Sequence, residues 1–141
     1  MSDREIMLKR LVVGDIFHAT FPAENPGGPS LVCLIESTTA TSINSRTITT
    51  QRQFQFDRQT GEAEVIDGKP VLARGDDKGA CTIDSVAPLP VDIHNVMLGI
   101  DRKFRLARSE WFDKSPARFN LDDAEQKAII FIGSYYPANP L

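Results

Sequence analysis

The chain has 141 residues and a formal net charge of −3, and 41% of its residues are apolar and 25% charged. This length suits one domain with an adequate hydrophobic core, and the composition excludes an intrinsically disordered chain. No apolar run reaches the roughly 18 residues that a membrane span needs, and the charged N-terminus lacks the apolar stretch of a secretion signal. We therefore expect a single domain over 1–141, in the cytoplasm and without membrane contact.

The residues that carry metal or acid–base chemistry are few. Cys33 and Cys81 each lie in an apolar, strand-like run, which favours two reduced core thiols over a disulfide. His94 adjoins the apolar stripe of a predicted helix, whereas His18 lies in a predicted strand with no sequence neighbour that would orient it for catalysis. Metal-ligand spacings and glycine-rich phosphate loops are missing. The sequence therefore predicts no metal site, no cofactor and no recognisable catalytic motif.

The N-terminal third predicts short strands joined by turns. Residues 1–10 are interpreted as a polar arm or a half-turn of helix, and 15–21 as a strand. The prolines and glycines of 22–29 exclude a helix or a central strand. The apolar run 31–35 predicts a strand buried on both faces, and the Ser/Thr-rich segment 37–45 predicts a loop or an exposed edge.

The clearest pattern is the alternation of apolar and polar residues over 47–56. Ile48, Phe54 and Phe56 fall on one parity, so one face of a long strand is expected to be buried. The opposite parity carries five uncharged polar side chains: Thr47, Thr49, Gln51, Gln53 and Gln55. A turn at Asp57–Gly61 and a returning strand at Glu62–Ile66 complete a predicted hairpin.

The chain from 67 to 86 continues the same pattern. We expect a turn at 67–70, a short strand at 71–73, a turn at 75–79 and a last strand at 80–86. About five or six short strands at this spacing predict a meander that curls into a small barrel or a sandwich.

A helical pattern follows the Pro88-Leu89-Pro90 segment. A stripe with helical spacing predicts a helix over 90–107, formed by Ile93, Val96, Met97, Ile100 and Phe104. A second helix is expected over 121–135, capped by Asn120 with Asp123 and ended by Pro137 and Pro140. The β-forming run 128–132 leaves a strand as the alternative.

The predicted fold class is α+β, with a small curled antiparallel β-sheet or partly open barrel and two C-terminal helices. The β-rich part spans 11–87 and the helical part 90–136.

Two surfaces could bind a partner. The first is the polar face of the predicted long strand, which could equally be a solvated face of a hairpin. The second is basic and aromatic, and we predict binding through Arg52, Arg102, Arg105, Arg108 and Trp111. Its aromatic side chains could instead fix the helix to the barrel. The sequence predicts a non-catalytic binding module for a protein or a nucleic acid, and it favours a binding role over an enzyme.

One part of the sequence resembles a known family. Gly14–Ile16, followed by 26–32 and by Ile48–Thr50, is similar to the start of the SH3-like barrel ribonuclease toxins of toxin–antitoxin pairs. Those barrels have an arginine before the second strand, where this chain has Gly28. The resemblance implies an SH3-like barrel. It also implies the alternative function of an endoribonuclease, which substitution of Thr50 or Arg46 would test.

Overall fold

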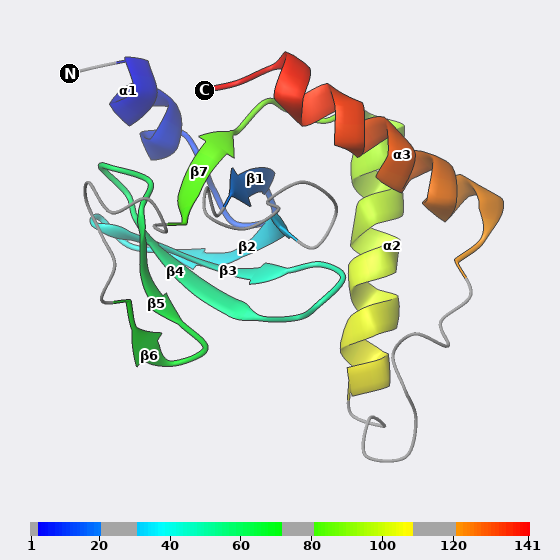
Figure 1. Ribbon diagram of the computed structural model, residues 1–141, viewed down its shortest axis with the longest axis horizontal. Helices are drawn as coiled ribbons and strands as arrows, with labels where there is room; N and C mark the ends of the chain where they lie inside the picture. Colours follow the sequence, from blue (N-terminus) through cyan, green and yellow to red (C-terminus); the bar gives the residue numbers. More distant parts are fainter. Residues whose placement is uncertain (1–2, 21–30, 72–80, 109–120) are drawn as a thin grey trace.

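The structure, a computed structural model, describes residues 3–20, 31–71, 81–108 and 121–141. Figure 1 shows a curled β-sheet with two helices on one side and a short N-terminal helix on the other. The predicted loop at 22–29, the turn at 75–79 and Trp111 lie outside the described residues. No helix of the described ranges is long and apolar enough to cross a membrane.

Seven strands and three helices make up the described part of the chain. In order they are α1 (Asp3–Lys9), β1 (Ile16–Thr20), β2 (Val32–Thr38), β3 (Ser42–Thr47), β4 (Gln53–Asp57), β5 (Ala63–Ile66), β6 (Lys69–Pro70), β7 (Thr82–Ser85), α2 (Val91–Arg108) and α3 (Asp123–Ala138). The predicted helix over 90–107 and the hairpin of β4 and β5 are confirmed.

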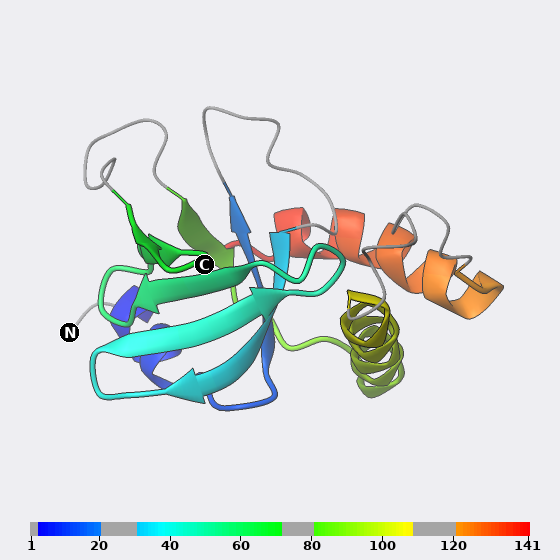
Figure 2. The ribbon, with the colours of Figure 1, turned by 90° about the horizontal axis from the view of Figure 1, so that it is seen from below.

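The strands form one antiparallel sheet in the order β6-β5-β4-β3-β2-β1-β7. β1 to β6 follow one another as a meander, and β7 returns beside β1. A bridge between Glu62 and Thr82 brings β7 against the start of β5, so the sheet curls into the half-barrel seen in Figure 2. The predicted α+β class, with a partly open barrel and two C-terminal helices, is confirmed.

Alternating side chains along the strands separate two hydrophobic cores. Phe17, Ile35 and Phe56 point into the barrel and belong to the inner core. Ile16, Val32 and Leu34 point outward and join the helix-side core, which also contains Ile48, Met97, Ile100, Ala128, Ile132 and Tyr136. A strand sends successive side chains to opposite faces, so β1 and β2 are apolar on both.

The predicted long strand over 47–56 is wrong, although Phe54 and Phe56 are buried as expected. β3 ends at Thr47, a turn follows, and Gln51 adopts a positive φ of 54° before β4 begins. Because of this turn, even-numbered residues before and after it lie on opposite faces of the sheet. Ile48 therefore packs in the helix-side core, while Phe54 belongs to the inner core.

The prediction of a loop or exposed edge at 37–45 is also wrong for most of its length. The end of β2 and the start of β3 occupy this segment and pair with each other. The inward Ile43 is fully buried, whereas Ser37 on the outer side is exposed. Short polar side chains are compatible with a strand when one of its faces is in contact with water.

The run 128–132 is helical, so the strand alternative is wrong. Two details of this helix also differ from the prediction. Its N-cap is Asp122, which forms a capping box with Glu125, rather than Asn120 with Asp123. Pro137 lies inside the helix, which extends to Ala138. The capping box satisfies the first backbone donors of α3, and a buried stripe of Ala128, Ile132 and Tyr136 then fixes its orientation.

Candidate functional site

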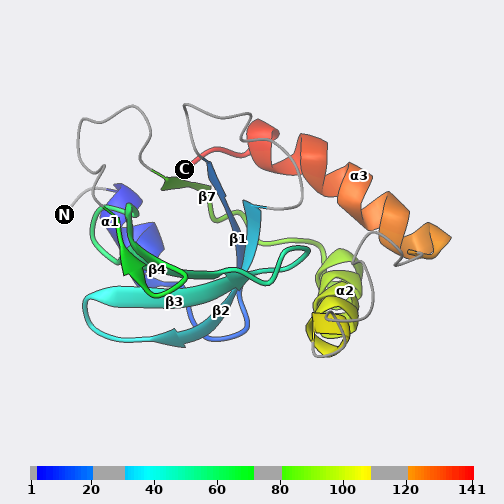
Figure 3. The same cartoon turned by 60° about the horizontal axis from the view of Figure 1, so that its bottom comes forward.

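The outer side of β2, β3 and β4 carries a group of polar side chains, which we call the polar face. It consists of Ser37, Ser42, Asn44, Arg46, Gln53 and Gln55, placed together by the cross-strand register. Figure 3 shows α2 beside one end of these strands. Gln53 is exposed, and Asn44 and Gln55 are half-buried. The polar face therefore presents hydrogen-bonding groups at the surface of the protein.

The side-chain amides of the polar face use their donors within the protein. The Asn44 amide donates to the Ser37 hydroxyl over 3.1 Å. Gln53 donates to Glu36 at 3.2 Å, and Gln55 donates to Glu64 at 2.9 Å. No described residue donates to the side-chain oxygens of Asn44, Gln53 and Gln55. Three acceptors held in place by these bonds are thus open to a partner.

A shallow hollow of about 130 Å³ lies on this face. Asn44, Gln53 and Gln55 line it together with Val65 and Gly68. Gly68 lies in the turn from β5 to β6 and has a φ of +80°, a conformation that suits glycine. The hollow combines amide groups with an apolar wall, so it is able to receive a small side chain.

A buried carboxylate marks the border between the polar face and the helix layer. Asp101 on α2 is only 2% exposed and accepts two hydrogen bonds from the Arg46 guanidinium, at 2.9 and 2.8 Å. Gln51 donates a third at 2.8 Å, and Arg105 lies 3.9 Å away. This network joins α2 to β3 and to the turn after it, and so positions the polar face against the helix.

The charges around Asp101 set its protonation. Burial by itself raises the pKa of Asp101, but the hydrogen bonds from Arg46 and Gln51 and the charges of Arg46 and Arg105 hold that pKa below its ordinary value. The pKa of Arg46 is raised, chiefly by its hydrogen bond to Asp101 and against the effect of burial. Both groups are therefore charged at neutral pH.

Of the predicted binding residues, the structure describes the side chains of Arg52, Arg102 and Arg105. Arg52 pairs with Asp67 at 3.0 Å, near the β5–β6 turn. Arg102 and Arg105 are exposed on α2. Arg108 ends that helix, but its side chain and Trp111 lie outside the described part. Phe104 packs against the helix-side core, as expected if the aromatic residues fix the helix to the sheet.

The polar strand face predicted from parity is only half right. Gln53 and Gln55 do lie on the polar face, whereas Thr47 and Gln51 are buried. Thr49 belongs to the turn between β3 and β4. The other polar positions of this face are held by Asn44, Ser42 and Ser37. The sequence analysis missed these three residues because it assigned 37–45 to a loop or an exposed edge. Their alternation with Ile43 and Ser45 was the signal that could have identified them.

A histidine–aspartate pair lies on the helix-covered part of the outer side of the sheet. The Nδ1 atom of His18 on β1 is 2.7 Å from a carboxylate oxygen of Asp84 on β7. His18 is 6% exposed, and its ring lies 5.5 Å from that of Tyr136 on α3. The pair therefore links two strands beneath a helix. Sequence reasoning missed it because its members are 66 positions apart.

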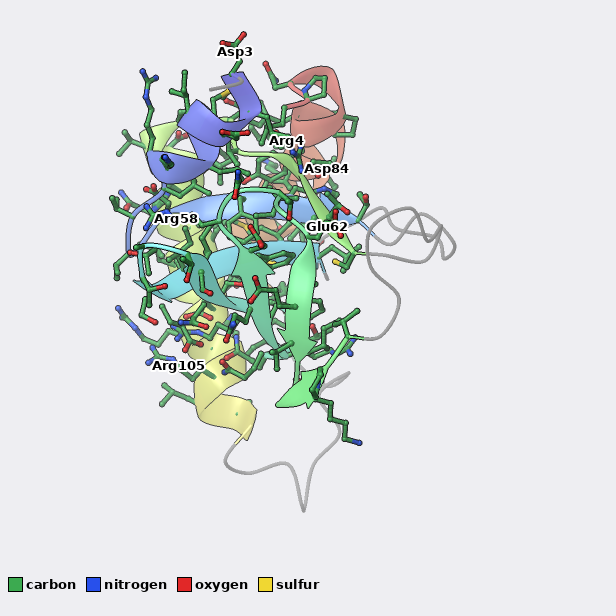
Figure 4. The ribbon with its side chains drawn as sticks, turned by 90° about the vertical axis from the view of Figure 1, so that its left-hand side faces the viewer. Asp3, Arg4, Arg58, Glu62, Asp84 and Arg105 are labelled. Carbon is green, nitrogen blue, oxygen red and sulfur yellow. The ribbon has the colours of Figure 1, made fainter. Side chains whose placement is uncertain are left out.

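Arg4 on α1 extends this group toward the N-terminus. Its guanidinium donates to the backbone oxygens of Thr60 and Ile83, and Figure 4 shows it beside Asp84. A Cβ atom on Gly61 would lie 2.6 Å from the Arg4 Nη2 atom. A side chain at this position would displace the Arg4 guanidinium, whose bonds to Thr60 and Ile83 join α1 to the closure of the barrel.

Comparison with known proteins gives no further assignment. No protein-family model matches the chain, and neither a curated protein nor a solved structure matches it. Functional inference consequently rests on the geometry of the described residues.

Proposed function

We propose that this protein is a non-catalytic binding module that recognises a segment of a protein partner on the polar face. The observation that carries the proposal is the set of open side-chain acceptors on Asn44, Gln53 and Gln55. An extended polypeptide offers backbone N–H groups as donors that can reach these side-chain oxygens. The adjoining hollow would hold one of its side chains.

The charge balance supports a protein partner over a nucleic acid. Arg46 is paired with Asp101 and Glu36, and Arg52 is paired with Asp67. Binding to a phosphate backbone depends on an excess of cations that displaces counterions. Both arginines are already paired with carboxylates, and uncharged amides form the centre of the polar face.

The test compares a triple variant, Asn44→Ala, Gln53→Ala and Gln55→Ala, with wild-type protein. A partner retained by immobilised wild-type protein is identified, purified and titrated against both proteins. We expect the triple variant to bind it at least about tenfold more weakly, because each lost hydrogen bond is worth about 0.5–1.5 kcal/mol.

The matched control carries Asn95→Ala and Gln126→Ala, which remove exposed amides from α2 and α3. This control should bind the partner as tightly as wild-type protein. Equal affinity of the triple variant would contradict the proposal. A different result would also overturn it: retention of single-stranded RNA at low salt that is lost on changing Arg102→Glu and Arg105→Glu.

A further inference from the structure

A second and larger pocket lies between α1 and the ends of two hairpins. Its volume is about 380 Å³, within the range of small-molecule sites. Glu5 and Lys9 on α1, Thr41 in the β2–β3 turn, and Arg58 and Gln59 in the β4–β5 turn contribute to its lining. Three separate segments thus converge on one polar cavity, which does not include the polar face.

Arg58 is the fixed cation of this pocket. Its guanidinium donates to the backbone oxygens of Thr39, Lys9 and Leu11, at distances of 2.7, 2.9 and 2.7 Å. Figure 4 shows Arg58 close to the end of α1. These three bonds hold the side chain in a single position and connect the helix end to both hairpin turns.

Arg58 is not paired directly with a carboxylate of the described protein. None of the ion pairs among the described residues includes Arg58 or Lys9. An arginine has five N–H donors, and the three bonds to carbonyl oxygens leave two of them without an acceptor. One is the Nε–H group, which is buried, and the other is on Nη1, whose first hydrogen donates to Thr39. A rigid cation with a spare Nη1 donor is a suitable receptor for a carboxylate.

The same pocket also contains carboxylates. Glu5, Asp57 and Glu64 line it together with the two cations. Glu64 is fixed by the hydrogen bond from Gln55 at 2.9 Å. A simple anion would be repelled by these groups, and a simple cation would be repelled by Arg58 and Lys9. A ligand that carries one positive and one negative group can pair with the carboxylates and with the cations of the lining.

We propose that this pocket is a binding site for a free amino acid, a small zwitterion. Its carboxylate binds at Arg58 and Lys9, and its ammonium group binds at Glu5 and Glu64. The lining has one more carboxylate than cations, so a basic amino acid such as L-lysine complements it best. The pocket is separate from the polar face but is joined to it by the hydrogen bond that Gln55 donates to Glu64.

The experiment titrates the full-length protein with L-lysine and follows backbone amide resonances by NMR. Saturable shifts of residues around the β4–β5 turn are expected. Two derivatives separate the charges, because Nα-acetyl-lysine lacks the α-ammonium group and lysinamide lacks the carboxylate. Each should bind about tenfold more weakly than L-lysine, since each loses one charge-assisted contact. L-Glutamate should bind more weakly than L-alanine.

Two variants locate the site without removing the bonds of Arg58. Lys9→Met removes a cation whose side chain forms no ion pair in the described structure, and Gln59→Trp fills the pocket from an exposed position. Both should lose affinity for L-lysine, while Arg52→Met, on a different surface, should retain it. Absence of saturable shifts in wild-type protein would overturn the proposal. Equal binding of L-lysine and both derivatives would also overturn it.

Discussion

The outer side of the sheet has two regions that differ in what covers them. The helix-covered region contains Ile16, Val32 and Leu34 beneath α2 and α3. The polar face continues along the same strands with amides and hydroxyls. Helices pack on the apolar part of this face, because the removal of apolar area from water is favourable there. The polarity of these side chains therefore decides where the helix layer ends.

The transition between the regions occurs at one network. On β2 and β3, Leu34 and Arg46 are cross-strand partners, and the first is in the helix-side core while the second binds Asp101. Asp101 lies one residue after the fully buried Ile100. The helix thus contributes an apolar contact to one region and a charged contact to its border.

The largest difference between the two regions should appear on truncation. Ile100→Ala should lower the free energy of unfolding by about 2–5 kcal/mol, because it leaves a cavity in a close-packed core. Gln55→Ala on the polar face should lower it by only about 0.5–1.5 kcal/mol, the worth of the hydrogen bond that Gln55 donates to Glu64. Chemical denaturation measures both. Similar costs for the two variants would show that the regions do not differ in packing.

A smaller effect is expected at the border. Asp101→Asn should lower the free energy of unfolding by about 2–3 kcal/mol, because Arg46 keeps its charge in a partly buried position without a carboxylate. A double-mutant cycle with Arg46→Met tests the pairing. The two costs should be strongly non-additive, since the residues are in direct contact. Additive costs would mean that the network does not link the helix to the sheet.

The smallest effect depends on pH. The pKa of Asp101 is lower in the folded protein than its ordinary value, so the unfolded state binds this proton more readily. The stabilisation that the Asp101 carboxylate provides is therefore complete above the pKa of Asp101 in the unfolded chain, near pH 4. It is lost as the pH falls through the pKa of Asp101 in the folded protein. Wild-type protein and Asp101→Asn should converge in stability below this range. Denaturation curves at several acidic pH values provide the measurement, and a constant difference would contradict the assignment.

The elements that local pattern determines were predicted well. The helical stripe from Ile93 to Phe104 predicted α2, and the alternation of Phe54 and Phe56 predicted the buried face of β4. Both patterns consist of apolar residues that recur at the spacing of a single helix or strand, so they are visible in a short window of sequence. The choice between helix and strand at 128–132 followed from the nearby acidic residues, even though Asp122 proved to be the cap.

The sequence by itself determined the curled sheet, the two C-terminal helices and the apolar side of each. Only the tertiary structure decided that the chain turns after Thr47 and that Ile48 and Phe54 belong to opposite cores. It also decided that His18 pairs with Asp84 and that α1 and two hairpin turns meet at Arg58. Periodicity describes neighbours within an element, whereas these contacts join residues far apart in the chain, and only packing in three dimensions selects them.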